Sequence, residues 1–290
     1  MNSDCNSCGF VCKRHPSTFK PEGLKQICRG DRGPSLQLAY REAWDQIEAA
    51  SQRKQGAFCE VSTDEPNSGK RLVITVATGH KFHELLDVTE PLMRAYSARI
   101  GADFVALRNE TQSWWGLEKF RVKKFARAYD RTLFVDCDVI LRSETPDMFS
   151  LVPPGSVGLH QDYPHLTQDA WLKTEWAAVM ASQGVPRVLP EQSCLNTGVV
   201  VCDKSTAYIW DAPPRPLPGQ HCDEQLWIES TIRTFGVPVV ELHSSLNCQW
   251  WMRDFAKREP LSSVVHLANC PIDERTAMAK RLAGNNAGNP

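Results

Sequence analysis

Short apolar runs alternate with longer amphipathic stretches from residue 71 onward. A run as continuously apolar as RLVITVA suits a strand that is buried on both faces of a sheet. Strands that alternate with helices tend to pair in parallel and to be covered by those helices. The pattern predicts an α/β fold with a mostly parallel sheet. The predicted strands are RLVITVA (71–77), DFVAL (103–107), TLFVD (132–136), GSVGLH (155–160), NTGVVVCD (196–203), VPVVEL (237–242) and SSVVHLA (262–268).

Stretches with helical spacing of apolar residues lie between these strands. Pro91 is expected to kink or restart the first helix because proline lacks a backbone donor, and Gly101 is expected to end it. The last nine residues, LAGNNAGNP, are expected to fray. The predicted helices are HELLDVTEPLMRAYSARIG (83–101), LEKFRVKKFARAYD (117–130) and DEQLWIESTIRTFG (223–236).

The first 69 residues differ in composition from the rest of the chain. A basic, cysteine-rich segment is followed by one predicted helix, SLQLAYREAWDQIEAASQR (35–53). A linker of turn-forming residues, STDEPNSGK (62–70), comes next. We therefore expect a cysteine-rich, metal-binding extension over 1–69 and the main domain over 70–290.

The extension carries four closely spaced thiols, Cys5, Cys8, Cys12 and Cys28. Four thiolates suit a structural zinc ion or an iron–sulfur cluster, and the alternative is a set of ordinary reduced thiols. We expect a zinc ion, because zinc binding can supply the folding energy that so small a segment lacks.

The composition of the chain limits the classes of protein to which it can belong. The chain has 290 residues, and its 33 basic side chains nearly balance its 34 acidic ones, which argues against a nucleic-acid partner held by bulk charge. No apolar stretch approaches the roughly 20 residues of a membrane span, and the N-terminus lacks the apolar region of a signal peptide. The eleven cysteines cannot all pair within one chain. We expect reduced thiols and a cytoplasmic protein.

Two carboxylates lie at the end of the predicted strand TLFVD: Asp136 is its last residue, and Asp138 comes two residues later. If the strand persists, residues two apart point the same way. Ligands of parallel sheets bind beyond the carboxyl ends of the strands, and paired carboxylates are hard ligands for Mg²⁺ or Mn²⁺. The alternative is structural, with Asp136 closing the strand and Asp138 paired to a surface arginine.

The segment YDRTLFVDCDVILRSETPDMF (129–149) resembles the DxD segment of the glycogenin-like nucleotide-sugar glycosyltransferases, which are glycosyltransferase family 8 and its relatives and have the GT-A fold. The resemblance extends in family order over about residues 71–278. RLVITVATG resembles the first strand and nucleotide-binding turn, and LEKFRV the lysine-bearing helix start. CLNTGVVVCD, DEQLWI and VVHLAN resemble the family segments FNSGVMV, DQDVLN and IHF.

The resemblance implies a hexosyltransferase-like enzyme that transfers a sugar from a nucleotide-sugar donor, with retention of anomeric configuration. UDP is the commonest donor nucleotide of the family. Asp136, Asp138 and His266 would hold the metal, and a histidine ligand favours Mn²⁺ over Mg²⁺. The acceptor, whether glycan, protein or small molecule, is not implied. Taken alone, His266 on an apolar strand reads as a core histidine.

Further roles carry over by resemblance. Thr78 lies in the nucleotide-binding turn, and Lys119 is placed near the donor phosphates or sugar. Asn196, Asp223 and Gln225 are placed at the donor sugar or acceptor, as catalytic candidates. The alternatives remain open: Lys119 on a solvated helix face, Asn196 as a turn former, and Asp223 as a carboxylate favoured at a helix start.

The family's late HxxGxxKPW pattern is not intact. Asn269 stands where its glycine is expected, and no KPW follows. Arg275 or Lys280 is the candidate to replace the missing phosphate-binding lysine.

Two other classes compete with this interpretation. LFVDCDV also matches the nucleophile strand of haloacid-dehalogenase-type phosphatases, in which the first aspartate attacks phosphorus. In that class the motif opens the domain, whereas two strands precede it here. The second alternative is a zinc-dependent binding protein with a degenerate transferase domain, against which the complete Asp-Asp-His set argues.

Overall fold

A computed structural model describes residues 70–108, 115–162, 170–184, 193–219 and 221–286 of the chain. The cysteine-rich extension with Cys5, Cys8, Cys12 and Cys28, its predicted helix and the linker lie outside the described residues. Their predicted structure and metal site therefore stay predictions.

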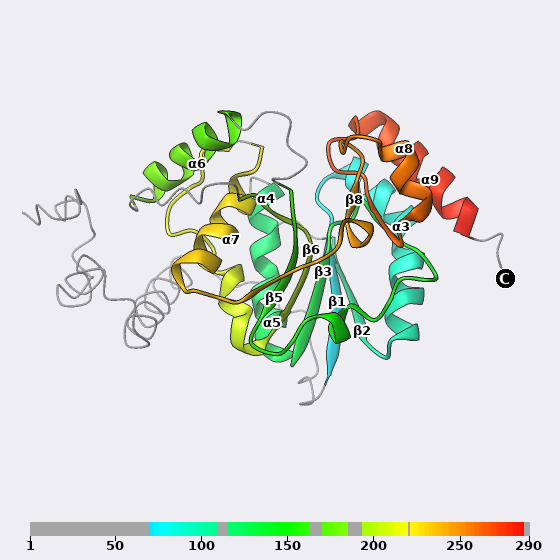
Figure 1. Cartoon of the computed structure of the whole chain (residues 1–290), viewed down its shortest axis with the longest axis horizontal. Coiled ribbons are helices and arrows are strands. Elements are labelled where there is room, and N and C mark those ends of the chain that lie inside the picture. The colour runs from blue at the N-terminus through cyan, green and yellow to red at the C-terminus, as the bar shows by residue number, and fades with distance from the viewer. Residues whose placement is uncertain (1–69, 109–114, 163–169, 185–192, 220, 287–290) are drawn as a thin grey trace, which may run out of the picture.

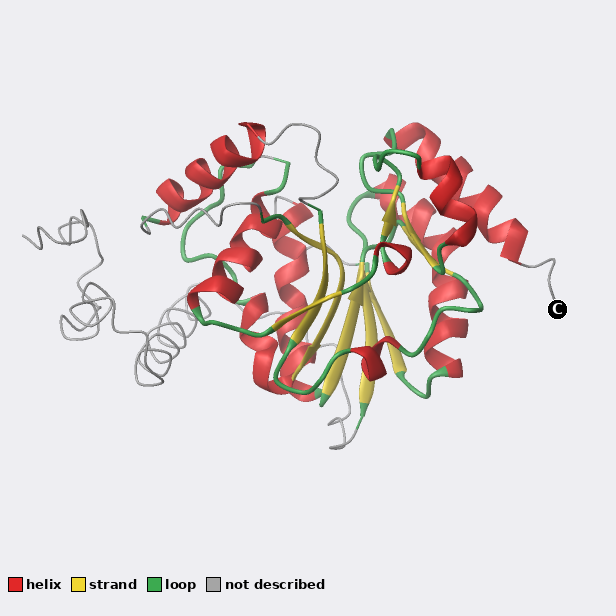
Figure 2. Ribbon diagram, viewed as in Figure 1, coloured by secondary structure: helices red, strands yellow, loops and turns green. Residues whose placement is uncertain are grey.

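The centre of the molecule is a six-stranded sheet in the order β2-β1-β3-β6-β5-β7 (Figures 1 and 2). β6 runs antiparallel to both of its neighbours, and the other pairs are parallel. The predicted α/β fold with a mostly parallel sheet is therefore confirmed. The strands are β1 (Arg71–Val76), β2 (Asp103–Leu107), β3 (Arg131–Val135), β5 (Val157–Gln161), β6 (Leu195–Asp203) and β7 (Val239–Glu241).

Helices cover both faces of this sheet, as Figure 1 shows. Successive residues of a strand point to opposite faces, so each central strand supplies two cores. On β3, Phe134 joins the core under one group of helices, whereas Leu133 and Val135 join the other core. One face carries α3 (His80–Arg99) and α9 (Ile272–Asn286), and the other carries α4 (Trp115–Glu118), α5 (Val122–Ala128), α6 (Ala170–Gln183) and α7 (Asp223–Thr234).

A second, three-stranded sheet has the order β4-β9-β8. It consists of β4 (Val139–Leu141), β8 (Cys248–Gln249) and β9 (Val264–His266). β9 pairs antiparallel with β4, so His266 lies opposite Val139. The same strand pairs parallel with β8, which sets Gln249 beside His266. This small sheet carries the late part of the chain back to the end of β3.

Several helices differ from the prediction. α3 continues through Pro91, and Leu86 and Met93 on either side of the proline are fully buried, so tertiary packing maintains the helix across it. Gly101 follows the helix at φ 66°, the left-handed conformation that suits glycine at a helix end. The predicted helix 117–130 is split by a 3₁₀ turn, Lys119–Arg121.

The structure also contains elements that the sequence analysis missed. The short helix α8 (Phe255–Arg258) precedes β9. α6 was not predicted at all, and α9 extends to Asn286 into the tail that was expected to fray. Leu282, inside that tail, is fully buried in the core beneath α3 and α9. Burial of this side chain explains why the helix continues.

Candidate active site

A cavity of about 700 Å³ opens at the edge of the main sheet where β1 and β3 end. Thr78 follows β1, and Asp136 and Asp138 follow β3. β6 is antiparallel, so its first residues, including Asn196, reach the same edge. The cavity thus lies where ligands of open α/β sheets bind.

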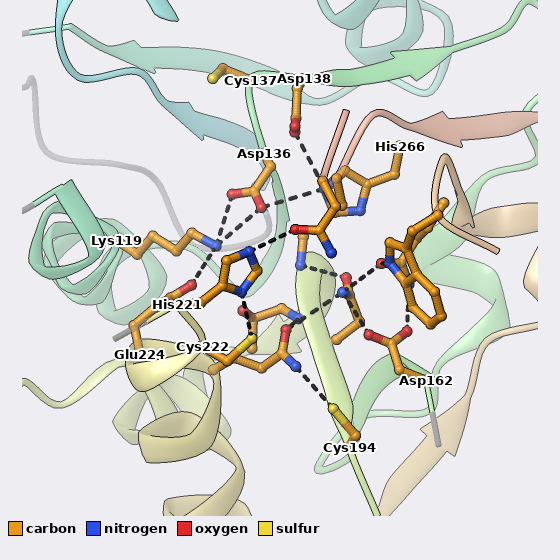
Figure 3. Close-up of a pocket in the computed structure, with 18 of the residues that line it drawn as sticks. Lys119, Asp136, Cys137, Asp138, Asp162, Cys194, His221, Cys222, Glu224 and His266 are labelled. Atoms are coloured by element: carbon orange, nitrogen blue, oxygen red, sulfur yellow. Dashed lines mark hydrogen bonds and ion pairs between the residues drawn. The ribbon is translucent and has the colours of Figure 1, made fainter. Parts of the chain in front are cut away.

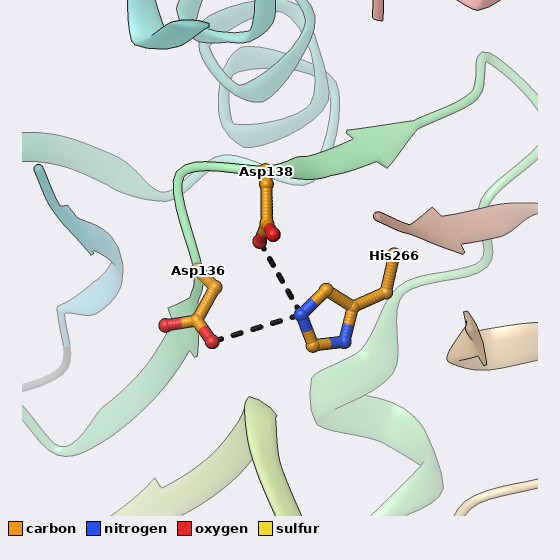
Figure 4. Close-up of side chains that lie close together, drawn as sticks. All are labelled: Asp136, Asp138 and His266. Carbon is orange, nitrogen blue, oxygen red and sulfur yellow. Dashed lines mark ion pairs between the residues drawn. The ribbon is translucent and has the colours of Figure 1, made fainter. Parts of the chain in front are cut away.

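Asp136, Asp138 and His266 converge at the floor of this cavity (Figure 4). His266 Nε2 lies 3.3 Å from Asp138 Oδ1 and 3.7 Å from Asp136 Oδ2. One ligand atom from each residue falls within 4.8 Å of the others. Two carboxylates and an imidazole in this spacing fit a divalent cation with mixed oxygen and nitrogen ligands. No second cluster of at least three such ligands occurs in the part of the chain that the structure describes.

A turn, rather than a continued strand, brings the two carboxylates together. β3 ends at Val135, and Val139 N donates to Asp136 O at 3.0 Å to close a turn around Cys137. The condition that the strand persists to Asp138 is therefore not met. After the turn, Leu267 N donates to Asp138 O at 3.1 Å, which holds His266 next to the second aspartate.

Two neighbours fix the position of the His266 imidazole. Its Nδ1 lies 3.0 Å from Asn247 Oδ1, so Nε2 is the nitrogen that faces the carboxylates. On its other side is the backbone of Gly198, where a β-carbon would overlap the ring. His266 is only 3 % exposed. Although buried, it faces the two carboxylates, so its Nε2 lies where it can share a divalent cation with them.

Two cations stand beside the carboxylates. Lys119 Nζ lies 3.0 Å from Asp136 and 3.1 Å from Glu224 (Figure 3). Burial alone would lower the pKa of this lysine, but the two carboxylates raise it above its ordinary value. Lys119 is thus a buried, charged group, and not part of the solvated helix face considered from the sequence.

The second cation, Arg275, is at the start of α9 and its Nη1 lies 2.9 Å from Asp138 Oδ2. Burial by itself would raise the pKa of Asp138, but His266 and Arg275 bring it down to about 2. Lys280, the other candidate for a phosphate-binding cation, is exposed and does not line the cavity. Asn269, at the position where the family pattern predicts a glycine, adopts φ 61°, a left-handed conformation that asparagine tolerates better than most residues.

The remaining predicted site residues divide into two groups. Thr78, Asn196 and Gln225 line the cavity together with the metal-ligand candidates. Asp223 does not line it: the residue is fully buried, and its Oδ2 accepts a hydrogen bond from Gly219 N at 2.6 Å. Asp223 thus fits the alternative of a carboxylate at a helix start. Glu224, the next residue on α7, faces the cavity in its place.

Glu224 was missed by the sequence analysis. The residue is 3 % exposed, and its Oε2 has no hydrogen-bond partner among the described residues, while Oε1 accepts from Lys119. Burial raises its pKa, and Lys119 opposes that effect. A buried carboxylate with an unused oxygen is suited to contact a ligand in the cavity.

A second carboxylate, Asp162, was also missed. It follows β5 and accepts hydrogen bonds from Asn196 Nδ2 at 3.1 Å and from Gln249. Burial raises its pKa to about 7 despite these two donors. Asp162 comes two residues after the predicted strand GSVGLH, so the signal used for Asp136 and Asp138, an aspartate at or just beyond a strand end, could have found it.

Comparison with known proteins identifies the fold. No protein-family model and no curated protein matches the chain. A glycosyltransferase involved in the glycosylation of the major capsid of PBCV-1 superimposes with a TM-score of 0.51 and 14 % identity, covering 73 % of this chain and 99 % of that one. The bifunctional glycosyltransferase WbbM gives 0.46 at 11 % identity (81 % and 52 % covered), and GlyE of Streptococcus pneumoniae TIGR4 gives 0.42 at 12 % (74 % and 62 %).

None of the helices within the described ranges is long and apolar enough to cross a membrane.

The sheet order, the helices on both faces and the first of the structural matches agree on one architecture. The chain has the fold of a GT-A-type glycosyltransferase.

Proposed function

We propose that the chain is a metal-dependent glycosyltransferase that uses a nucleotide-sugar donor, with UDP as the nucleotide and Mn²⁺ as the preferred cation. The observation that carries the proposal is the cluster of Asp136, Asp138 and His266 at the ligand-binding edge of a GT-A fold. The cations Lys119 and Arg275 flank this cluster and suit a diphosphate.

Asp136, Asp138 and His266 would hold the ion. A divalent cation bound there supplies positive charge against the negative charge that develops on a leaving diphosphate. Arg275 contacts the carboxylate oxygen of Asp138 that does not face His266, so it can reach a phosphate beside the ion. Thr78, in the turn after β1, is proposed at the nucleotide.

The donor sugar is proposed to lie near Glu224, Asn196 and Gln225. Lys119 links the proposed sugar site to the proposed metal site, because it contacts both Glu224 and Asp136. In the transfer, the acceptor oxygen bonds to the anomeric carbon while the bond from that carbon to the diphosphate oxygen breaks. The electron pair leaves with the nucleoside diphosphate, which also takes the acceptor's proton. Retention of configuration is proposed from the family resemblance.

Three further proposals rest on the sequence. Cys5, Cys8, Cys12 and Cys28 hold one structural zinc ion in the N-terminal extension. The protein acts in the cytoplasm. Nucleic acid is not a partner, because the charges nearly balance.

Consumption of UDP-sugars by the full chain tests the enzymatic proposal. A panel of UDP-sugars is incubated with Mn²⁺, and release of UDP is followed by chromatography. We expect slow hydrolysis of one donor that stops with EDTA and returns with Mn²⁺. Release of phosphate from simple phosphomonoesters, lost in Asp136→Asn, would instead identify the phosphatase alternative. Absence of any hydrolysis or UDP binding would favour the degenerate binding protein.

A further inference from the structure

Two tryptophans in the cavity are not explained by the proposed donor contacts. Trp171 and Trp251 both line it, among side chains that are otherwise largely polar or charged. Trp171 is 38 % exposed, and it is one of four large apolar side chains that are exposed within the described ranges. Because Trp171 is exposed and lines the cavity, part of its indole is accessible to a ligand there.

The side-chain donor of Trp251 already has a partner. Its Nε1 donates to Gln249 Oε1 at 2.8 Å, and Gln249, a fully buried residue of the cavity wall, also donates to Asp162. The neighbouring Trp250 N donates to His266 O at 2.9 Å, so this segment is tied to the strand of the metal-ligand candidate. With its one donor satisfied inside, Trp251 has only the hydrocarbon of its rings to present to the cavity.

Trp171 belongs to a different wall of the cavity. It is in the first turn of α6, and Glu175, one turn later on the same helix face, also lines the cavity. Glu175 Oε2 accepts from Cys222 N at 3.3 Å, which ties α6 to the residue before α7 and thus close to Glu224. Figure 1 shows α6 and β8, which precedes Trp251, on opposite sides of this end of the sheet.

Indole surfaces next to buried polar side chains favour a ligand with apolar faces and polar edges. A pyranose ring has both, because its C–H bonds line its faces and its hydroxyl groups project from its rim. Aromatic rings pack against such C–H faces, and the buried polar groups nearby can accept or donate to hydroxyls. Asp162, Asn196 and Gln225 supply these polar groups. Peptides also bind aromatic-lined grooves, so the transfer experiment below includes a peptide acceptor as a competing outcome.

We propose that the cavity binds a carbohydrate acceptor, and that the indoles of Trp171 and Trp251 each offer an apolar surface to a sugar ring. The inference rests on the proposed function for the transfer itself, but acceptor binding is separable from it. The chemical class of acceptor is thereby narrowed from glycan, protein or small molecule to a glycan or glycoside.

Binding without the donor is tested first. Methyl glycosides of glucose, galactose and xylose are titrated into the full chain and binding is measured by calorimetry. We expect saturable binding of at least one glycoside, retained in Trp171→Phe and Trp251→Phe and weakened at least tenfold in Trp171→Ala and Trp251→Ala. Leu261→Ala, which removes an exposed apolar side chain outside the cavity, should bind like the wild type. Absence of binding by every glycoside would overturn the inference, whether or not UDP binds.

Transfer then separates the acceptor from the donor. With the UDP-sugar that is hydrolysed, the alanine variants should raise KM for the glycoside at least tenfold and leave the UDP dissociation constant unchanged. An equal loss of UDP-sugar affinity would assign the indoles to the donor and overturn the acceptor assignment. Transfer to serine or threonine peptides in preference to glycosides would overturn it as well. In either case the proposed glycosyltransferase function would stand.

Discussion

The backbone of Gly198 lies directly against the imidazole of His266, so that a β-carbon at this position would overlap the ring. Gly198 is in β6, and its carbonyl accepts from Asp136 N at 2.8 Å. One glycine therefore touches the histidine and the first aspartate of the metal-ligand cluster. Its lack of a side chain is a requirement of the site and not of the strand.

Gly198→Ala should consequently damage the metal site more than the fold. Either His266 or β6 must shift, and overpacking of this kind typically costs about 1–3 kcal/mol of stability. We expect Mn²⁺-dependent UDP affinity to fall at least tenfold, measured by calorimetry. Gly284→Ala is the matched control, because a β-carbon there meets no atom within 4 Å. Undiminished affinity in Gly198→Ala would show that His266 is not a ligand in this position.

Lys119→Met should destabilise the protein. The ammonium group lies between Asp136 and Glu224, and its loss leaves two largely buried carboxylates without their cation. Breaking a buried pair in this way costs about 3–5 kcal/mol, measured by urea unfolding. Lys124→Met, an exposed neighbour on α5, serves as the control.

The double variant Lys119→Met, Glu224→Gln sharpens this test. Removing the charge of Glu224 should restore part of the stability lost in Lys119→Met, because the two residues are in direct contact. Donor hydrolysis should be lost in Lys119→Met and should not return in the double variant. If the change in free energy of unfolding in the double variant equals the sum of the changes in the two single variants, the result argues against the contact.

Asp162 should make stability depend on pH. Burial raises its pKa from 3.8 to about 7, so the folded state holds this proton more tightly than the unfolded chain does. Its contribution therefore falls as the pH rises from about 4 to 7. The free energy of unfolding of Asp162→Asn, relative to wild type, should rise across this window by up to roughly 4 kcal/mol. Urea unfolding at pH 5, 6, 7 and 8 measures it, and a difference that does not vary with pH would contradict the raised pKa.

The N-terminal cysteines should bind one zinc ion per chain. Metal analysis of protein purified without oxygen distinguishes zinc from an iron–sulfur cluster, which would bring iron and sulfide and a brown colour. Cys8→Ser should lose the metal and keep Mn²⁺-dependent UDP binding, because the proposed donor site lies entirely within residues 70–290. Protein with neither metal would show that these cysteines are ordinary thiols.

The central strands of the main sheet were predictable because burial on both faces makes their sequences continuously apolar. RLVITVA and NTGVVVCD are read correctly as β1 and β6 on that basis. β4 and β8, with three and two residues, are too short to show any period. These short strands set His266 beside Asp138, so the convergence of the triad followed from the family resemblance and not from the pattern of residues.

Neighbouring residues in the first turn of a helix were harder to separate. Asp223 and Glu224 are consecutive acids at the start of α7, and helical geometry points them about 100° apart. The sequence cannot say which of the two faces the sheet edge. Packing of α7 decides it, burying Asp223 against Gly219 and directing Glu224 to Lys119. The aspartate was consequently preferred as a catalytic candidate, and the glutamate was missed.

Calorimetric titration of UDP into the full chain, with and without Mn²⁺, tests whether Asp136, Asp138 and His266 hold a cation that the nucleotide needs. We expect that wild type and Asp273→Ala, which changes an exposed aspartate on α9, bind UDP only with Mn²⁺. Asp138→Ala should lose this binding at least a hundredfold and still unfold cooperatively on heating. Binding of UDP with Mn²⁺ that is unchanged in a folded Asp138→Ala variant would contradict the assignment of the metal site and, with it, the proposed mechanism.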